Sequence, residues 1–294
     1  MFNSEEFLLK SLEDHYEIGA AKELVPISTG RTSEACRIVT EHGDQYVLRR
    51  LRSNQQAVCE YEISSIAAAN HMSPYILPGR HANGFIEVQG NLYNLQHYLD
   101  PDKVSVQDKF LQMGNALGSL HTVLRHTKIP HQVDRFSLEI SWNTATFSHN
   151  ISGNLRTSLE KYITDCLEIE QRREGIIHAD LGIWNVIFHA ASVYFIDYGE
   201  ARTGDYHFDA AALLTSSMSK TWTDQQVATH ILNFKKGYEQ SGLQLEQDSL
   251  LKNMILWLVR GAAAVLAEHG ETEQTINYVK QIISDISKYN RLMG

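Results

Sequence analysis

The chain has 294 residues, with 35 acidic and 26 basic side chains, a formal charge of −9 and no long run of Lys or Arg. This balance argues against nucleic acid as the main partner, and 43% apolar with 21% charged residues is ordinary for a soluble globular protein. Three isolated cysteines, Cys36, Cys59 and Cys166, lack CxxC spacing and favour a reducing compartment. An acidic start and no apolar stretch long enough for a bilayer lead us to expect a cytoplasmic protein without a membrane partner.

The first third of the chain reads as strand-rich. A short helix is expected over residues 4–16, with Ser4 as its N-cap. Residues 35–40 and 45–51 flank Glu41-His-Gly-Asp44, which is typical of a hairpin, and a second hairpin is expected for residues 85–88 and 92–98. Between the hairpins, residues 54–70 read as a helix.

After Pro101 the pattern becomes helical. Ser105 with Asp108 resembles a capping box before apolar residues spaced three and four apart over 110–124. Residues 154–172 and a segment after an N-cap at Thr223 also read as helices, whereas residues 176–195 read as strand–loop–strand. We therefore predict an α+β fold with two lobes: a β-rich lobe at 1–98 and a mainly helical lobe at 99–294.

The strongest chemical signal is His178-Ala-Asp180-Leu-Gly-Ile-Trp-Asn185, which has the spacing H-x-D-x-x-x-x-N of a kinase catalytic loop. Phosphoryl transfer needs a carboxylate to orient the attacking hydroxyl, and ligands for a metal that neutralises the phosphates. Asp180 suits the first role and the amide oxygen of Asn185 the second. The alternative is that Asp180 and Asn185 are turn residues and His178 is a core histidine.

A second motif follows in the expected order. Residues 193–196 form a short apolar run that ends in Asp197-Tyr-Gly, one aromatic residue away from the DFG pattern in which the Asp holds Mg²⁺. The intervening residues 189–192 fit a hairpin turn. The alternative for Asp197 is a cap at a strand end.

Together, IIHADLGIWNVIF and VYFIDYGEARTGDYHFDAAALL resemble the core of the aminoglycoside phosphotransferase/choline kinase superfamily. The resemblance covers about residues 175–214 and implies a protein-kinase-like fold that uses ATP and Mg²⁺. It implies that Asp180, with His178, is catalytic and that Asn185 and Asp197 bind the metal. The later aspartate of the family pattern, here Asp209, buttresses the catalytic loop; an N-cap of the following helix is the equal alternative.

The first lobe is expected to supply the nucleotide contacts. In Gln45-Tyr-Val-Leu-Arg49-Arg50, Arg49 matches the cation that holds the phosphates in the family pattern, and Arg50 must face the opposite side of a strand. Glu60 is the expected ion-pair partner of that cation, with Glu62 as the competitor.

Two further nucleotide contacts are expected from position in the chain. Gly30, Thr32 and Ser33 lie in a Gly/Ser/Thr-rich segment where the phosphate loop belongs, and Gln96 and Tyr98 lie where an adenine-binding hinge belongs. Both segments have ordinary alternatives, a hairpin tip and an edge strand.

Other enzyme classes fit less well. A protein kinase fits less well because Gly182 stands where Ser/Thr protein kinases have a lysine. An A-P-E motif is also absent, because the sequence has no proline after Pro130. No G-x-x-x-x-G-K-[ST] is present, which excludes a P-loop kinase. A metal-dependent hydrolase that uses His178, Asp180 and Asp197, and a weak or inactive kinase-like binding protein, are the remaining alternatives.

The resemblance implies a hydroxyl acceptor on a small molecule such as an aminoglycoside, choline, ethanolamine, homoserine or a sugar. Acceptor candidates in the helical lobe are Trp257, Arg260, Glu268 and Tyr238, and the acids Glu200, Asp205 and Glu268 could receive a cationic amine. The choice between ATP and GTP, the acceptor and the oligomeric state stay open.

Overall fold

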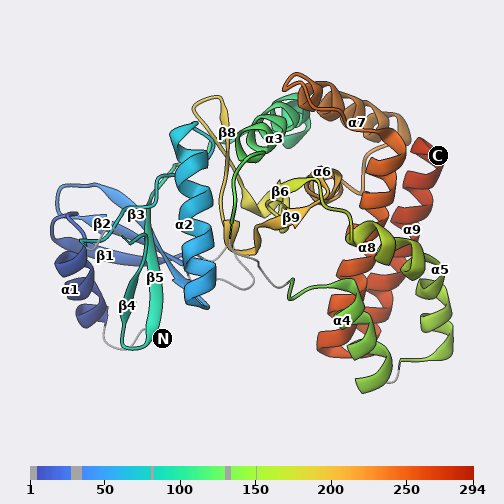
Figure 1. Cartoon of the computed structure of the whole chain (residues 1–294), viewed down its shortest axis with the longest axis horizontal. Coiled ribbons are helices and arrows are strands. Elements are labelled where there is room, and N and C mark those ends of the chain that lie inside the picture. Colours follow the sequence, from blue (N-terminus) through green and yellow to red (C-terminus); the bar gives the residue numbers. More distant parts are fainter. Residues whose placement is uncertain (1–4, 28–34, 81–82, 130–133, 150) are drawn as a thin grey trace. The chain divides into compact units, whose positions relative to one another are not determined.

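A computed structural model describes residues 5–27, 35–80, 83–129, 134–149 and 151–294, and Figure 1 shows its helices and strands. The helices are α1 (Glu5–His15), α2 (Asn54–Ala69), α3 (Phe110–Leu124), α4 (Leu138–Asn143), α5 (Gly153–Glu170), α6 (Tyr206–Ser217), α7 (Asp224–Glu239), α8 (Gln247–His269) and α9 (Glu273–Met293). The strands are β1 (Ala21–Pro26), β2 (Ala35–Thr40), β3 (Gln45–Leu51), β4 (Ile86–Val88), β5 (Asn91–His97), β6 (Gly175–Ile177), β7 (Val186–His189), β8 (Ser192–Phe195) and β9 (Arg202–Gly204). Short helical turns are η1 (Val106–Lys109), η2 (Thr144–Ser148), η3 (Ile183–Asn185) and η4 (Tyr198–Glu200).

The chain forms two compact units that are interleaved in sequence. Unit 1 comprises Met1–Val104, Lys128–Pro130 and Trp184–Ala201. Unit 2 comprises Ser105–Thr127, His131–Ile183 and Arg202–Gly294. The sequence-based division at residue 98 treats the lobes as consecutive, whereas residues 184–201 pack with the N-terminal part.

Unit 1 is built on a five-stranded antiparallel sheet with the order β1-β2-β3-β5-β4 (Figure 1). The two expected hairpins are confirmed as β2–β3 and β4–β5. In β2, and in β3 up to Leu48, alternate residues are buried, and Ile38 and Leu48 lie in the core on that face. Arg49 and Leu51 are buried on the other face of β3. Helix α1 contacts β1 and β4, and helix α2 contacts β3 and β5.

The β7–β8 hairpin joins unit 1 through backbone hydrogen bonds. Phe195 N–H donates to Met72 O at 2.8 Å, and Asp102 N–H donates to Phe188 O at 2.7 Å. The hairpin was expected around residues 189–192, and its two central residues, Ala190 and Ala191, both have positive φ, as a tight two-residue turn requires. These bonds fix the ends of β7 and β8 within unit 1.

Unit 2 is mainly helical. Helix α3 packs along α7, and α8 contacts α4, α5, α6 and α9 (Figure 1). Among the described helices, α8 alone is long and apolar enough to cross a membrane by length and composition, which differs from the expectation that no apolar stretch is long enough. Its contacts with four helices and the buried Arg260 within it are those of a core helix.

Of two helix starts predicted from the sequence, one is confirmed and the other is wrong. Thr223 caps α7 in a full capping box with Gln226, as expected for an N-cap at that position. The expected capping box at Ser105 is wrong: among the described contacts, its side chain makes no capping bond. The 3₁₀ turn η1 lies between Ser105 and the start of α3 at Phe110, so Ser105 stands a turn too early.

The pairing of α3 with α7 depends on two glycines that face each other's helix. A Cβ on Gly114 would lie 2.0 Å from Phe234 O, and a Cβ on Gly237 would lie 2.0 Å from Leu111 O. Both contacts are with backbone, which cannot move aside as a flexible side chain does. Any larger residue at either position must separate the helices.

We therefore predict that Gly114→Ala lowers the free energy of unfolding by about 1–3 kcal/mol through overpacking. Urea denaturation followed by circular dichroism measures this. Gly153→Ala is the matched control, because no described atom lies within 4 Å of its added Cβ. It should be neutral or stabilising; equal losses in both variants would contradict the explanation.

Candidate active site

In unit 1, Arg49 of β3 is a buried cation between two carboxylates. It is 5% exposed and forms ion pairs with Glu60 of α2 and with Asp197, whose Oδ1 lies 2.6 Å from Nη2. Burial alone would lower the pKa of the Arg49 guanidinium, but Asp197 and Glu60 raise it above its ordinary value. Arg49 therefore stays charged and links β3, α2 and the segment that follows β8.

The geometry distinguishes the candidates that the sequence left open. Arg50, on the opposite face of β3, is exposed and donates from Nη2 to Asn91 Oδ1 at 2.6 Å. Glu62 is exposed, whereas Glu60 faces into unit 1 and is 1% exposed. The structure thus brings Arg49 and Glu60 together.

Asn185 and Asp197 lie at the same end of the β7–β8 hairpin. The last strand pair is Val186 with Phe195, and beyond it Ile196 N–H donates to Asn185 O at 3.1 Å. Asn185 is 5% exposed and the Asp197 side chain 27% exposed. One amide oxygen and one carboxylate form the hard oxygen donor set that Mg²⁺ takes, so the residues present fit that ion.

The backbone at Asp197 has the left-handed conformation, φ 68° and ψ 57°. For a residue other than glycine this conformation costs on the order of 1–3 kcal/mol and is characteristic of functional sites. Aspartate adopts this conformation more readily than most other residues, and the ion pair with Arg49 further fixes the direction of the Asp197 side chain.

The turn after Asp197 is attached to α2 and to Arg52, which lies just before that helix. Cys59 Sγ donates to Ala201 O at 3.6 Å, and Arg52 forms an ion pair with Glu200. A Cβ on Gly199 would lie 2.3 Å from Gln56 Nε2, so only glycine fits there without displacing Gln56. Helix α2 thus positions both Glu60 and the segment that carries Asp197.

The expected hinge residues lie at the end of β5. Gln96 is buried, pairs with Val47 of β3 and forms a bridge with Ile76. Tyr98 N–H donates to Gln45 O at 3.1 Å and His97 N–H donates to Tyr75 O at 2.9 Å. These two N–H groups are thus already bonded within the protein. Gly30, Thr32 and Ser33 lie outside the described residues.

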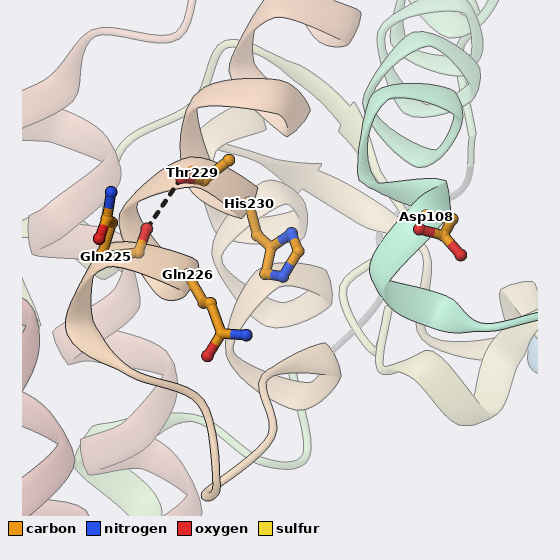
Figure 2. A pocket seen from close by; sticks show the side chains of 5 residues that line it. All are labelled: Asp108, Gln225, Gln226, Thr229 and His230. Atoms are coloured by element: carbon orange, nitrogen blue, oxygen red, sulfur yellow. Dashed lines mark hydrogen bonds between the residues drawn. The ribbon is translucent and has the colours of Figure 1, made fainter.

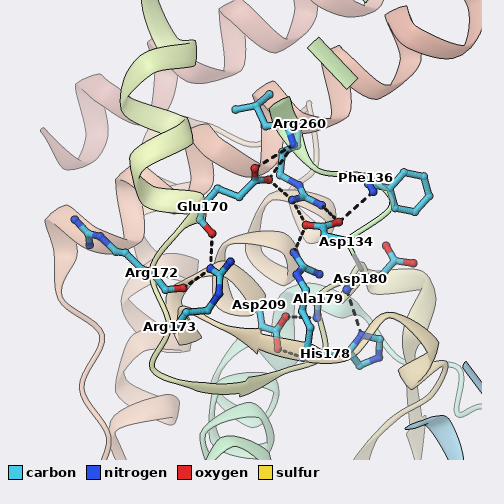
Figure 3. Close-up of polar contacts among 12 residues, drawn as sticks. Asp134, Phe136, Glu170, Arg172, Arg173, His178, Ala179, Asp180, Asp209 and Arg260 are labelled. Carbon is cyan, nitrogen blue, oxygen red and sulfur yellow. Dashed lines mark hydrogen bonds and ion pairs between the residues drawn. The ribbon is translucent and has the colours of Figure 1, made fainter. Parts of the chain in front are cut away.

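In unit 2, the segment His178–Asp180 follows β6, which pairs with β9. His178 is fully buried, Ala179 has a positive φ of 71°, and Asp180 is partly exposed. Asp209 of α6 accepts from the backbone N–H of His178 at 2.6 Å and of Ala179 at 2.8 Å (Figure 3). These two bonds hold a left-handed alanine, a conformation that costs about 1–2 kcal/mol.

Asp209 buttresses this loop, and the alternative that it caps the following helix is wrong. Helix α6 begins at Tyr206, and its N-cap is Asp205, whose side chain accepts from His207 N–H at 2.9 Å. Asp209 lies one turn later and is 0% exposed. Burial alone would raise the pKa of Asp209, but hydrogen bonds from His121 and from the His178 backbone lower it.

His121 of α3 is a site residue that our reading of the sequence missed. It is 0% exposed, with Nε2 3.1 Å from Asp209 Oδ2 and Nδ1 2.8 Å from Tyr238 Oη. The available signal was a histidine four residues after Leu117, on the apolar face of the helix. Nothing in the local pattern identifies its partner, which lies 88 residues further along the chain.

A network of two arginines and two acids surrounds the start of α4 (Figure 3). Arg260 of α8 forms ion pairs with Glu170 and, at 2.7 Å, with Asp134, and Arg202 is 2.9 Å from Asp134. Both Glu170 carboxylate oxygens accept from Leu138 N–H. This network ties α4, α5, α8 and β9 together.

Most of the side chains expected to bind the phosphate acceptor are instead engaged in contacts within unit 2. Arg260 belongs to the network above, Tyr238 contacts His121, and Asp205 caps α6. Trp257 packs edge-on against Phe208 at 5.5 Å. Arg260, Tyr238 and Asp205 are buried, Trp257 is partly exposed and Glu268 is exposed.

Glu174, Asp205 and His207 lie close enough to hold a metal ion. Both ring nitrogens of His207 are engaged, however: Nδ1 donates to Asp205 Oδ1 at 2.7 Å, and Nε2 accepts from Glu246 N–H at 3.1 Å. The Nδ1–H tautomer thus leaves no ring lone pair for a metal, and the cluster is a capping network.

A pocket of about 320 Å³ is lined by Asp108, Gln225, Gln226, Thr229 and His230. Figure 2 shows these side chains. Gln226 belongs to the α7 capping box, and Thr229 Oγ1 donates to Gln225 O at 2.8 Å. The described lining residues include none of the predicted site residues. The pocket therefore adds nothing to the site.

A model of the phosphotransferase enzyme family matches residues 23–245. The chain belongs to this family. The match includes Arg49, Glu60, Asp180, Asn185, Asp197 and Asp209. It confirms the resemblance seen in residues 175–214. A search of curated protein sequences finds no significant relative.

Solved structures of the family share the fold at low sequence identity. The amicoumacin kinase hAmiN, in complex with AMP-PNP, Ca²⁺ and Ami, has a TM-score of 0.77 at 14% identity, over 98% of this chain and 94% of that one. The microcompartment-associated aminopropanol kinase gives 0.69 at 17%, over 96% and 94%. Choline kinase LicA from Streptococcus pneumoniae gives 0.68 at 15%, over 97% and 98%. These matches confirm the protein-kinase-like α+β fold.

Because the pKa of Asp209 is lowered in the folded state, its contribution to stability is present at neutral pH and lost as the pH falls through that lowered value. We predict that Asp209→Asn costs about 1–3 kcal/mol at pH 7, since an amide NH₂ faces N–H donors. The difference from the native chain should shrink below about pH 4. Urea titrations from pH 7 to pH 3 test this; a constant difference would contradict it.

Proposed function

We propose that this phosphotransferase moves the γ-phosphate of ATP to a hydroxyl group of a small molecule of the aminoglycoside, amino alcohol, homoserine or sugar type. The observation that carries the proposal is the ion pair between buried Arg49 and Asp197, next to Asn185 at the end of the β7–β8 hairpin. A permanent cation beside two oxygen ligands suits a metal–triphosphate group.

In this proposal each residue has one role. Arg49, aimed by Glu60, binds phosphate oxygens, and Asn185 with Asp197 holds Mg²⁺. The ion would neutralise charge on the phosphates during transfer. Asp180 accepts the proton of the acceptor hydroxyl and orients it, while Asp209 keeps the backbone of His178 and Ala179 in place.

The choice of acceptor class is supported by the solved structures and by the composition. Their names include an aminopropanol kinase, a choline kinase and a spectinomycin phosphotransferase bound to ADP and spectinomycin. The formal charge of −9 suits a cationic acceptor. We also propose a cytoplasmic location, where ATP is available.

The first test is thermal unfolding of the purified protein with ATP, with and without Mg²⁺. We expect the unfolding temperature to rise with Mg-ATP and to rise less with ATP alone, because binding to the folded state stabilises it. A panel of amino alcohols, amino sugars, homoserine and sugars, assayed for ATP consumption, then identifies the acceptor. No shift at millimolar Mg-ATP would favour an inactive kinase-like binding protein.

Two substitutions separate the proposed roles. Asp180→Ala should lower turnover at least about 10³-fold, the loss typical of a reaction's essential carboxylate, and leave Mg-ATP binding nearly intact. Asp197→Ala should also lose the magnesium-dependent part of nucleotide binding. Asp224→Ala, at a side chain 54% exposed, is the control and should match the native chain. Native turnover in both site variants would refute the assignment.

A further inference from the structure

The His121 side chain lies in a buried series of polar contacts inside unit 2. Its ring lies between Asp209 of α6 and Tyr238 of α7, and it stacks on Tyr206 with ring centres 4.5 Å apart. His121, Asp209 and Tyr238 are each 0% exposed. Water therefore does not compete for these hydrogen bonds, and each group depends on its protein partner.

The acceptors fix the direction of the hydrogen bonds. Asp209 is a carboxylate, so Nε2 of His121 carries the proton and donates it. Burial and the nearby Asp209 charge raise the pKa of Tyr238, which keeps its phenol protonated. In the neutral His121 ring with its proton on Nε2, Nδ1 accepts from the Tyr238 hydroxyl, so donation then runs from Tyr238 to His121 to Asp209.

The same carboxylate holds the loop that precedes Asp180. Oδ2 of Asp209 accepts from both His121 and the His178 backbone, and Oδ1 accepts from the Ala179 backbone. Without the bond from His121, the described contacts that orient the carboxylate would be the backbone N–H groups of His178 and Ala179, of which Ala179 is strained. Because Ala179 is left-handed, a small rotation of Asp209 would release it toward an ordinary conformation.

We propose that His121 is a positioning residue for phosphoryl transfer: it orients Asp209, which fixes the backbone of His178 and Ala179 and so aims the carboxylate of Asp180. The inference rests on the proposed role of Asp180. A positioning role of His121 differs from a packing role in one respect. Packing needs only the shape of the ring, whereas positioning needs the N–H group at Nε2.

Two substitutions separate shape from hydrogen bonding. His121→Phe keeps an aromatic ring and removes the donor, and His121→Gln places an amide N–H near the position of Nε2. His207→Phe is the matched control, because His207 is also buried and also bonded to an aspartate, Asp205, near the start of α6. Its described contacts do not include the loop 178–180.

The kinetic arm measures ATP consumption at saturating Mg-ATP, with the acceptor found in the panel or with water as acceptor. We expect His121→Phe to lower kcat by roughly 10- to 100-fold, with the KM for Mg-ATP within about twofold, since the loss concerns the reacting geometry and not nucleotide binding. His121→Gln should recover most of the loss, and His207→Phe should keep native kcat.

The second arm measures hydrogen exchange of the amides of His178 and Ala179, and needs no activity. We expect faster exchange in His121→Phe, slower exchange again in His121→Gln, and native exchange in His207→Phe. If His121→Phe does not fold, Tyr238→Phe, which removes the donor to Nδ1, replaces it and should show the same changes to a smaller extent.

The outcomes separate this inference from the proposed function. Native kcat in His121→Phe, or equal losses in the Phe and Gln variants, would overturn the positioning role while leaving the kinase assignment intact. If the native chain shows no turnover at all, the proposed function fails. The exchange arm then decides alone whether His121 holds the loop, and unchanged exchange overturns that.

Discussion

In unit 2, the Asp209 carboxylate accepts hydrogen bonds from three N–H groups. Burying an ion costs several kcal/mol unless its partners replace water, and Asp209 is fully buried. The backbone of His178 and Ala179 and the ring of His121 supply the replacement. The position of Asp180 depends on this arrangement, because the left-handed Ala179 has no local reason to adopt its conformation.

Unit 1 contains the opposite case, a buried cation held by acids. Arg49 is paired with Glu60 and Asp197, and Cys59 of α2 also donates to Ala201 O beyond Asp197. Each unit thus holds candidate site residues, or the backbone beside them, with one buried charge that has several partners. Asp180 and Asn185 are five positions apart, so the backbone connects the loop held by Asp209 directly to the hairpin that precedes Asp197.

Local pattern was enough for much of the fold. Alternation and turn residues gave the β2–β3, β4–β5 and β7–β8 hairpins, and Thr223 with Gln226 gave the start of α7. The family motifs indicated the candidate site residues by their order in the chain. In each case the decisive residues lie within a few positions of one another.

Long-range partners could not be read in this way. The choice of Glu60 over Glu62 depends on which side of α2 faces β3, and the expected acceptor residue Arg260 is occupied by Asp134 and Glu170, both distant in sequence. At His121 the sequence showed only a polar residue on the apolar face of a helix. The prediction of a capping box at Ser105 was wrong because a 3₁₀ turn separates Ser105 from the start of α3. No nearby residue indicates that turn.

The interleaving of the units has a consequence for biosynthesis. Arg49 is made early, but its partner Asp197 is made 148 residues later, and residues 184–201 complete unit 1 only after much of unit 2 has left the ribosome. Until then, of the two acids that pair with Arg49, Glu60 is the one already made. The N-terminal part therefore lacks residues 184–201 of its own unit until late in synthesis, and a chain cut after residue 104 would lack them altogether.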